Sequence, residues 1–123
     1  MISNLRIQNI NRYTKEISDL NLKISQENKK EATLNDKINQ ILKSLNSKNV
    51  SLTSLTSKTS DMNRKQTEVA KCQQKKSELQ KKLGTAETNL LKEKQKLSKE
   101  QEAENKKMMA MNMMSGLGSF GQK

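Results

Sequence analysis

Residues 44–60, SLNSKNVSLTSLTSKTS, contain the three-residue repeat SLT-SLT-SKT and lie between two long helix-compatible stretches. Ser, Thr and Asn side chains form local hydrogen bonds that compete with the helical ladder, and β-branched Thr loses rotamer freedom in a helix. This segment is therefore the weakest helical window in the chain. We interpret it as the point where a long helical hairpin folds back. The alternative is that these residues form a less stable stretch within one continuous helix.

The stretch before this window carries a heptad pattern. Its apolar residues alternate in steps of three and four, which is typical of a coiled coil: Ile10, Tyr13, Ile17, Leu20, Ile24, Leu34, Ile38, Ile41 and Leu45. Glu27 and Glu31 interrupt the pattern with charge. These apolar positions together form the seam, the stripe along which the helix would pack. Residues 1–9 also contain apolar side chains, but these do not follow the heptad spacing. The pattern predicts a frayed start over residues 1–9 and a first helix over residues 10–46.

The stretch after the window repeats one column every seven residues: Leu55, Met62, Val69, Lys76, Leu83, Leu90, Leu97, Glu104 and Met111. The companion column, three positions further on, is apolar only around Cys72, Leu79 and Ala86. A helix with only one consistently apolar column can still be stable when it packs against a helix with a complete apolar seam, because helices in proteins are stabilised mostly by packing. The pattern predicts a turn over residues 47–57 and a second helix over residues 58–107.

The two seams can be aligned in only one good antiparallel register. When paired residue numbers add to 103, Leu20 meets Leu83 and Ile24 meets Leu79, while the interruption at Glu27 meets the one at Lys76. Sliding either arm by one heptad places a charge against aliphatic side chains, which is costly. In this register Cys72 faces Glu31. The register-setting residues are therefore predicted to be Glu27, Lys76, Glu31 and Cys72.

Residues 108–123, MMAMNMMSGLGSFGQK, have a composition unlike the rest of the chain. Methionine is flexible and polarizable, which suits adaptable apolar contacts with a partner. The candidate docking residues are Met108, Met109, Met111, Met113, Met114, Leu117 and Phe120. The alternative is a frayed, solvent-exposed tail. The sequence thus predicts an all-α fold, a long antiparallel helical hairpin of the coiled-coil type, with a flexible C-terminal tail that is rich in Met and Gly.

The composition argues against catalysis and against a cofactor site. Only 31% of the 123 residues are hydrophobic and 2% are aromatic, which is too little bulk for a core that encloses a pocket. The chain has no histidine and one cysteine, so an internal disulfide and ordinary metal sites are excluded. Because no apolar run resembles a secretory signal or a membrane span, we expect a non-enzymatic cytoplasmic protein without a cofactor or a transmembrane segment.

The net charge of +11 favours an acidic partner, which could be nucleic acid, an anionic membrane surface or an acidic protein face. Lysine pairs occur at residues 29–30, 75–76, 81–82 and 106–107. Arginines are few and aromatic residues almost absent, so sequence-specific recognition is not expected. Such lysines can provide nonspecific, salt-sensitive contact with nucleic acid.

Three segments carry a family resemblance: KISQENKKEATLNDKINQILKSLNSK (residues 23–48), SLTSLTSKTSDMNRKQTEVAKCQQKKSELQKKL (residues 51–83) and KEKQKLSKEQEAENKK. Together they resemble the N-terminal coiled-coil regions that precede TIR or TIR-like domains in some bacterial anti-phage defence proteins. No catalytic residue is carried over, because this chain continues into the Met/Gly segment. The resemblance implies a helical assembly module for a separate effector in phage defence.

The chain is also similar in length and layout to the small helical adaptors that accompany LXG toxins of type VII secretion, although it lacks a Trp-x-Gly turn. Our leading hypothesis is a coiled-coil assembly or scaffold subunit, forming a homo-oligomer or recruiting a protein partner, either an effector or a toxin. The alternatives are an adaptor for an LXG toxin and a basic coil that binds nucleic acid nonspecifically.

Overall fold

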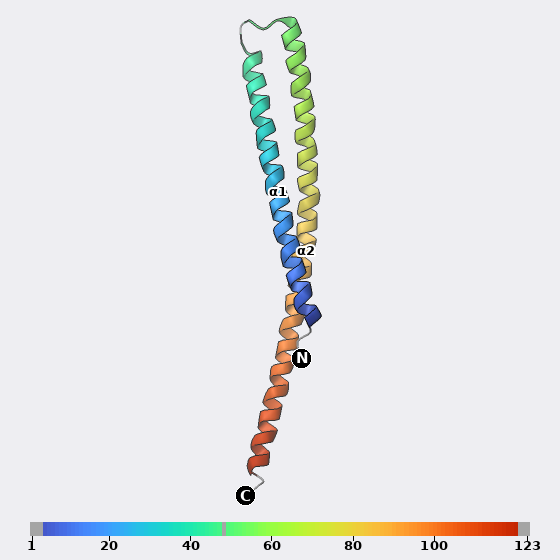
Figure 1. Cartoon of the computed structure of the whole chain (residues 1–123), viewed down its shortest axis with the longest axis vertical. Coiled ribbons are helices and arrows are strands. Elements are labelled where there is room, and N and C mark those ends of the chain that lie inside the picture. The colour runs from blue at the N-terminus through green and yellow to red at the C-terminus, as the bar shows by residue number, and fades with distance from the viewer. Residues whose placement is uncertain (1–3, 48, 121–123) are drawn as a thin grey trace. The chain divides into compact units, whose positions relative to one another are not determined.

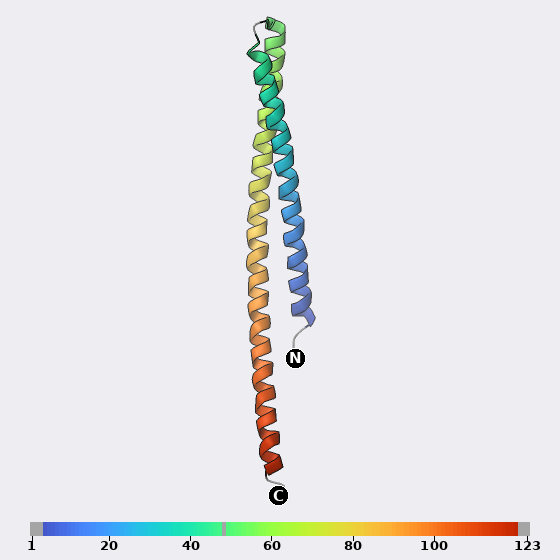
Figure 2. The same cartoon turned by 90° about the vertical axis from the view of Figure 1, so that its left-hand side faces the viewer.

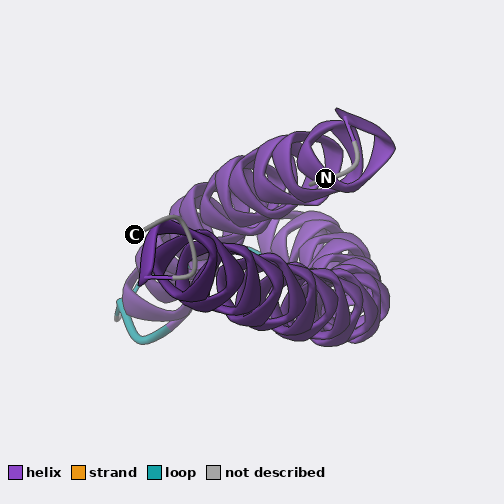
Figure 3. Cartoon of the chain, turned by 90° about the horizontal axis from the view of Figure 1, so that it is seen from below, coloured by secondary structure: helices purple, strands orange, loops and turns teal. Residues whose placement is uncertain are grey.

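The protein is all-α and consists of two long helices joined by a short loop, as a computed structural model shows (Figure 1). The structure describes residues 4–47 and 49–120, with side chains up to Met114. Helix α1 spans Asn4–Leu45 and helix α2 spans Leu52–Phe120. Within the described residues the structure contains no strand, and the helices account for everything except the loop over residues 46–51 (Figure 3). The predicted helical hairpin is confirmed.

The chain divides into two units, each built from a segment of α1 and a segment of α2. Unit 1 comprises Met1–Ile17 and Thr85–Lys123, and unit 2 comprises Ser18–Gly84. In unit 2, α1 and α2 lie side by side and antiparallel, with the loop at one end (Figures 1 and 2). In unit 1, the last part of α2 extends beyond the start of α1, as both views show.

The buried apolar residues follow the predicted seam. Those of the first arm are Leu20, Leu34 and Ile38, and those of the second arm are Cys72, Leu79 and Ala86. All six occupy positions of the heptad columns read from the sequence, so the periodicity identified the inward faces of both helices. In unit 2 the core is a thin stripe of side chains between the two helices.

The first helix begins earlier than predicted. Residues 4–9 are helical, whereas a frayed start was predicted over residues 1–9, and residues 1–3 lie outside the described part. The apolar side chains there miss the seam, but Arg6 forms ion pairs with Glu93 and Glu100 of α2. These contacts hold the first turns of α1 on α2 and replace the missing apolar packing.

The turn is also shorter than the predicted range of residues 47–57. Helix α2 begins at Leu52, and Ser51 acts as its N-cap, because the Ser51 hydroxyl accepts a hydrogen bond of 3.1 Å from the backbone N–H of Ser54. Thr56 donates its hydroxyl hydrogen to the Leu52 carbonyl at 3.0 Å. The Ser/Thr repeat therefore starts the second helix instead of forming the loop, since the hydroxyls of Ser51 and Thr56 bond to backbone groups of the helix.

The predicted helix end at Lys107 is not an end in the structure. Helix α2 continues to Phe120, through most of the segment 108–123 that was predicted as a tail. Met and Ala are good helix formers, and the chain contains no proline to stop the helix. Residues 121–123 lie outside the described part of the chain.

Candidate nucleic-acid interface

A layer of charged residues crosses the seam of unit 2. Glu27 is only 8% exposed, and its Oε1 lies 3.1 Å from Lys75 Nζ. Glu31 forms a second ion pair across the helices with Lys76 and accepts a hydrogen bond of 3.1 Å from Gln73 Nε2. Pairing matters here because an uncompensated charge in a seam is strongly destabilising.

These partners differ from the predicted ones, in which Glu27 faced Lys76. Side chains on a helix tilt toward its N-terminus, so Lys76 leans toward the loop, where Glu31 is the acidic residue opposite. Lys75, which lies beside the seam instead of on it, then pairs with Glu27. Lys75 was not predicted as a partner, because it lies outside the two seam columns.

The alignment of the two arms in unit 2 agrees with the predicted register. Three cross-helix contacts each lie one residue from it: Glu27 with Lys75, Glu31 with Gln73, and Ser44 with Lys58. The neighbouring registers are a full heptad away in either direction. That Glu27, Lys76, Glu31 and Cys72 determine this register stays a prediction.

The layer of charged residues, which we call the polar layer, shifts the pKa values of Glu27, Glu31 and Cys72. The hydrogen bond from Lys75 is the main reason why the pKa of Glu27 lies below its usual value, and Cys72 adds to the effect. Lys76 does the same for the pKa of Glu31. Burial, followed by the nearby Glu27 carboxylate, raises the pKa of Cys72, which is 2% exposed. Cys72 is thus buried in the seam, and Glu27 affects the pKa of its thiol more than Glu31, the residue that the predicted register places opposite it.

A groove between α1 and α2 opens beside this layer in unit 2. Its lining combines three lysines with two glutamates: Lys23, Gln26 and Glu27 from α1, and Lys75, Glu78, Leu79 and Lys82 from α2. All three lysines are exposed. Groups of this kind attract anions electrostatically without enclosing them.

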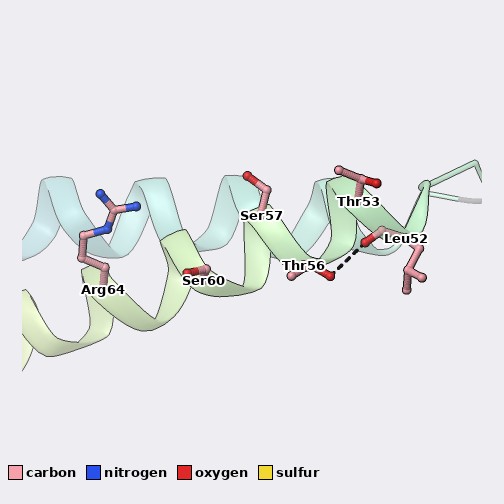
Figure 4. A pocket seen from close by; sticks show the side chains of 6 residues that line it. All are labelled: Leu52, Thr53, Thr56, Ser57, Ser60 and Arg64. Carbon is pink, nitrogen blue, oxygen red and sulfur yellow. Dashed lines mark hydrogen bonds between the residues drawn. The ribbon is translucent and has the colours of Figure 1, made fainter.

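A second hollow lies at the start of α2, as Figure 4 shows. It is lined by Leu52, Thr53, Thr56, Ser57, Ser60 and Arg64, all on one helix. Small-molecule sites bury most of their ligand between several walls. A hollow on a single helix does not offer that enclosure.

Unit 1 contains an ion-pair cluster that the heptad pattern did not predict. Arg6 Nη1 lies 2.7 Å from Glu93 Oε2, and Arg6 Nη2 lies 3.1 Å from Glu100 Oε1. The two hydrogen-bonded carboxylates raise the pKa of Arg6, and Arg6 in turn lowers the pKa of Glu93. Glu93 and Glu100 are seven residues apart in the companion column, and that spacing was the available signal. The cluster joins the two helices of unit 1.

The candidate docking residues lie on the last part of α2. Met108, Met109, Met111, Met113 and Met114 are between 58% and 73% exposed. The side chains of Leu117 and Phe120 lie outside the described part. The structure therefore presents five methionine side chains to solvent along about two turns of helix.

The described residues show neither a metal-binding cluster of His, Cys, Asp or Glu nor a helix apolar enough to cross a membrane.

Comparison with known proteins gives one short similarity. A stretch of 20 residues is 90% identical to a nucleoid-associated protein of Aliarcobacter butzleri (strain RM4018). The stretch covers 16% of this chain and 19% of that protein, so less than a fifth of the relative is matched. No family model matches the chain, and no solved structure matches it.

Proposed function

We propose that the chain is a non-enzymatic helical hairpin that binds nucleic acid without sequence specificity. The observation that carries this proposal is the placement of exposed lysines along the groove of unit 2, in a chain with a net charge of +11. Lysines neutralise phosphates and release the counterions condensed on nucleic acid, and this contact needs no base recognition. The short similarity to a nucleoid-associated protein supports the same proposal.

The proposal predicts a characteristic salt dependence. Binding of the full chain to a labelled duplex DNA of mixed sequence should be followed by fluorescence anisotropy between about 20 and 300 mM salt. The logarithm of the binding constant should fall linearly with the logarithm of salt concentration, with a slope of about −0.9 per phosphate contacted. Duplexes of unrelated sequence should bind equally well. Absence of binding at the lowest salt concentration would overturn the proposal.

A second candidate function is assembly, and the exposed methionines of residues 108–114 favour it. Methionine side chains adapt to apolar partners, and those exposed on this part of α2 can be buried against a helix of another molecule. The proposed partner is a second copy of the chain. Sedimentation equilibrium of the full chain should show an oligomer that dissociates when the chain is truncated after Lys107. An unchanged oligomeric state, or a monomeric full chain, would contradict this role.

A setting in phage defence, or beside an LXG toxin, stays a prediction that depends on the resemblances described above. The genes next to the one encoding this chain would test it. A neighbouring TIR effector would support the defence scaffold, a neighbouring LXG toxin would support the adaptor, and neither would leave the nucleic-acid proposal as the better supported one.

A further inference from the structure

The two flanks of the unit 2 hairpin differ in charge. Residues that sit directly beside the seam of α1 on the groove side are Lys23, Lys30 and Lys37, each seven residues apart. The equivalent positions on α2 are Asp61, Glu68, Lys75 and Lys82, so the flank is purely basic only in its half away from the loop. Lys23, Lys75 and Lys82 line one groove, and Lys30 lies close enough to Glu27 and Cys72 to affect the pKa of both.

The opposite flank carries amides instead of charges. The residues beside the seam there are Asn21, Asn28 and Asn35 on α1, and Gln66, Gln73 and Gln80 on α2. All six are exposed, and Gln73 reaches across to Glu31 with a hydrogen bond of 3.1 Å. Lysines that served only to keep the protein soluble could lie on either flank. Their restriction to one flank therefore needs another explanation.

In an antiparallel pair these flanking positions face each other across the seam. On the basic flank the residues that lie across from each other have numbers that add to 105, because they sit beside the seam pairs that add to 103. Lys23 then lies across from Lys82 and Lys30 from Lys75, giving two successive rungs of like charge, and the next rung toward the loop pairs Lys37 with Glu68. Coiled coils usually place opposite charges at such positions, because like charges repel. The Glu27 and Glu78 carboxylates in the same groove balance only part of this charge. The ion pair with Glu27 gives Lys75 a role in folding, but the repulsion between Lys23 and Lys82 is not explained in that way.

We infer that the two lysine rungs, Lys23 with Lys82 and Lys30 with Lys75, hold the phosphate backbone of a nucleic acid along one flank of the hairpin. This inference depends on the proposed nucleic-acid function and adds the binding face to it. Rungs one heptad apart are separated by about 10 Å along the helix, at 1.5 Å per residue. Duplex DNA carries a charge about every 1.7 Å of its axis when both strands are counted, so the two rungs can contact separate phosphates.

The experiment compares two double variants that lose the same charge from different faces. Lys23→Gln with Lys82→Gln removes one cation from each helix at the groove and leaves the Glu27 to Lys75 ion pair in place. Lys29→Gln with Lys43→Gln is the matched control, because both lysines are exposed on the outer face of α1. Circular dichroism and urea unfolding establish that both variants keep the helical fold.

The groove variant should bind duplex DNA at least about tenfold more weakly at about 50 mM salt, and its salt slope should be smaller by about two. The outer-face variant should stay within about twofold of the original chain. Equal losses in the two variants would overturn the inference while leaving nonspecific binding intact.

Two other outcomes concern the kind of partner. If the original chain binds no DNA at low salt, the proposed function fails together with the inference. If it then binds vesicles containing phosphatidylserine, or polyglutamate, through the same lysines, the flank recognises a membrane or an acidic protein, and the nucleic-acid assignment is overturned.

Discussion

Glu27 and Glu31 make the stability of the hairpin sensitive to acid. Their lysine partners lower the pKa of each carboxyl group below the ordinary value of 4.5. A group whose pKa is lower in the folded state stabilises that state above its unfolded pKa, and the contribution is lost as pH falls through the folded pKa. We expect the urea midpoint to drop between about pH 5 and pH 2.

The matched comparison is a chain with Glu27→Gln and Glu31→Gln. It should be less stable than the original chain at pH 7, and its urea midpoint should depend less on pH in the acid range. Asp61 and Glu93, whose pKa values are also lowered by hydrogen-bonded cations, would provide the remaining dependence. An identical acid dependence in the variant would contradict the assignment to the polar layer.

Cys72 provides a chemical test of burial in the seam. Burial raises its thiol pKa, and the thiolate is the form that reacts with alkylating agents. Iodoacetamide at about pH 8.5 should therefore modify the folded chain much more slowly than the chain unfolded in urea. Mass spectrometry measures both rates.

The Glu27→Gln variant should react faster than the original folded chain, since it removes the carboxylate that also raises the thiol pKa. Equal rates in folded and unfolded chain would show that the thiol is accessible.

At the scale of the helix, Gly84 is a position where α2 can be strengthened. A Cβ atom at Gly84 would meet nothing within 4 Å, and glycine in a helix interior costs about 1 kcal/mol relative to alanine. Gly84→Ala should therefore raise the free energy of unfolding by about 1 kcal/mol. Ala70→Gly, at an exposed position of the same helix, should lower it by a similar amount. Urea unfolding measures both changes, and a destabilised Gly84→Ala variant would indicate a role for Gly84 beyond helix propensity.

Disulfide crosslinking tests the alignment of the helices in unit 2. Cysteines at Ile24 and Leu79, with Cys72→Ala to remove the native thiol, should join within one chain under mild oxidation, because the register places these residues opposite each other. Ile24→Cys in a chain that keeps Cys72 is the control, since that pair corresponds to a register one heptad away. Efficient joining in the control, or joining only between chains in the test variant, would contradict the predicted register.

The sequence predicted the repeating interior of these helices well and their ends poorly. Leu20, Leu34, Ile38 and Leu79 were identified because burial repeats with the heptad. The ends depend on single contacts: Ser51 caps α2, and Arg6 draws the start of α1 onto Glu93. Such contacts leave no periodic signal, and the low helix propensity of Ser and Thr is easily overridden by capping and packing.

The candidate site was likewise predicted only where it affects the heptad pattern. The charged layer at Glu27 and Glu31 was visible as a gap in the apolar pattern. Which lysine pairs with which glutamate depends on side-chain tilt and reach, which the seam pattern does not contain, so Lys75 was missed. The lysine rungs were hidden for a related reason: each lysine is an ordinary surface residue until the fold places Lys23 and Lys82 in one groove.

For the molecule as a whole, the division into two units predicts unequal stability along the chain. Leu20, Leu34, Ile38, Cys72 and Leu79 are buried in unit 2, whereas Ala86 is the buried apolar residue among the described part of unit 1. Regions with few buried contacts open at lower free energy than the core. Hydrogen exchange followed by mass spectrometry should therefore show faster amide exchange in residues 4–17 and 85–114 than in the helices of residues 18–84.

The ion pairs of Arg6 are expected to stabilise the contact between the two helices of unit 1. Because its ion pairs with Glu93 and Glu100 connect the two helices there, Arg6→Gln should speed amide exchange in residues 4–17 while leaving residues 18–84 unchanged. Lys15→Gln, which removes an exposed cation from the same segment, should have little effect on either unit. Faster exchange throughout the chain in the Arg6 variant would mean that the two units unfold together. Unchanged exchange would mean that the ion pairs contribute nothing measurable, as many exposed pairs do.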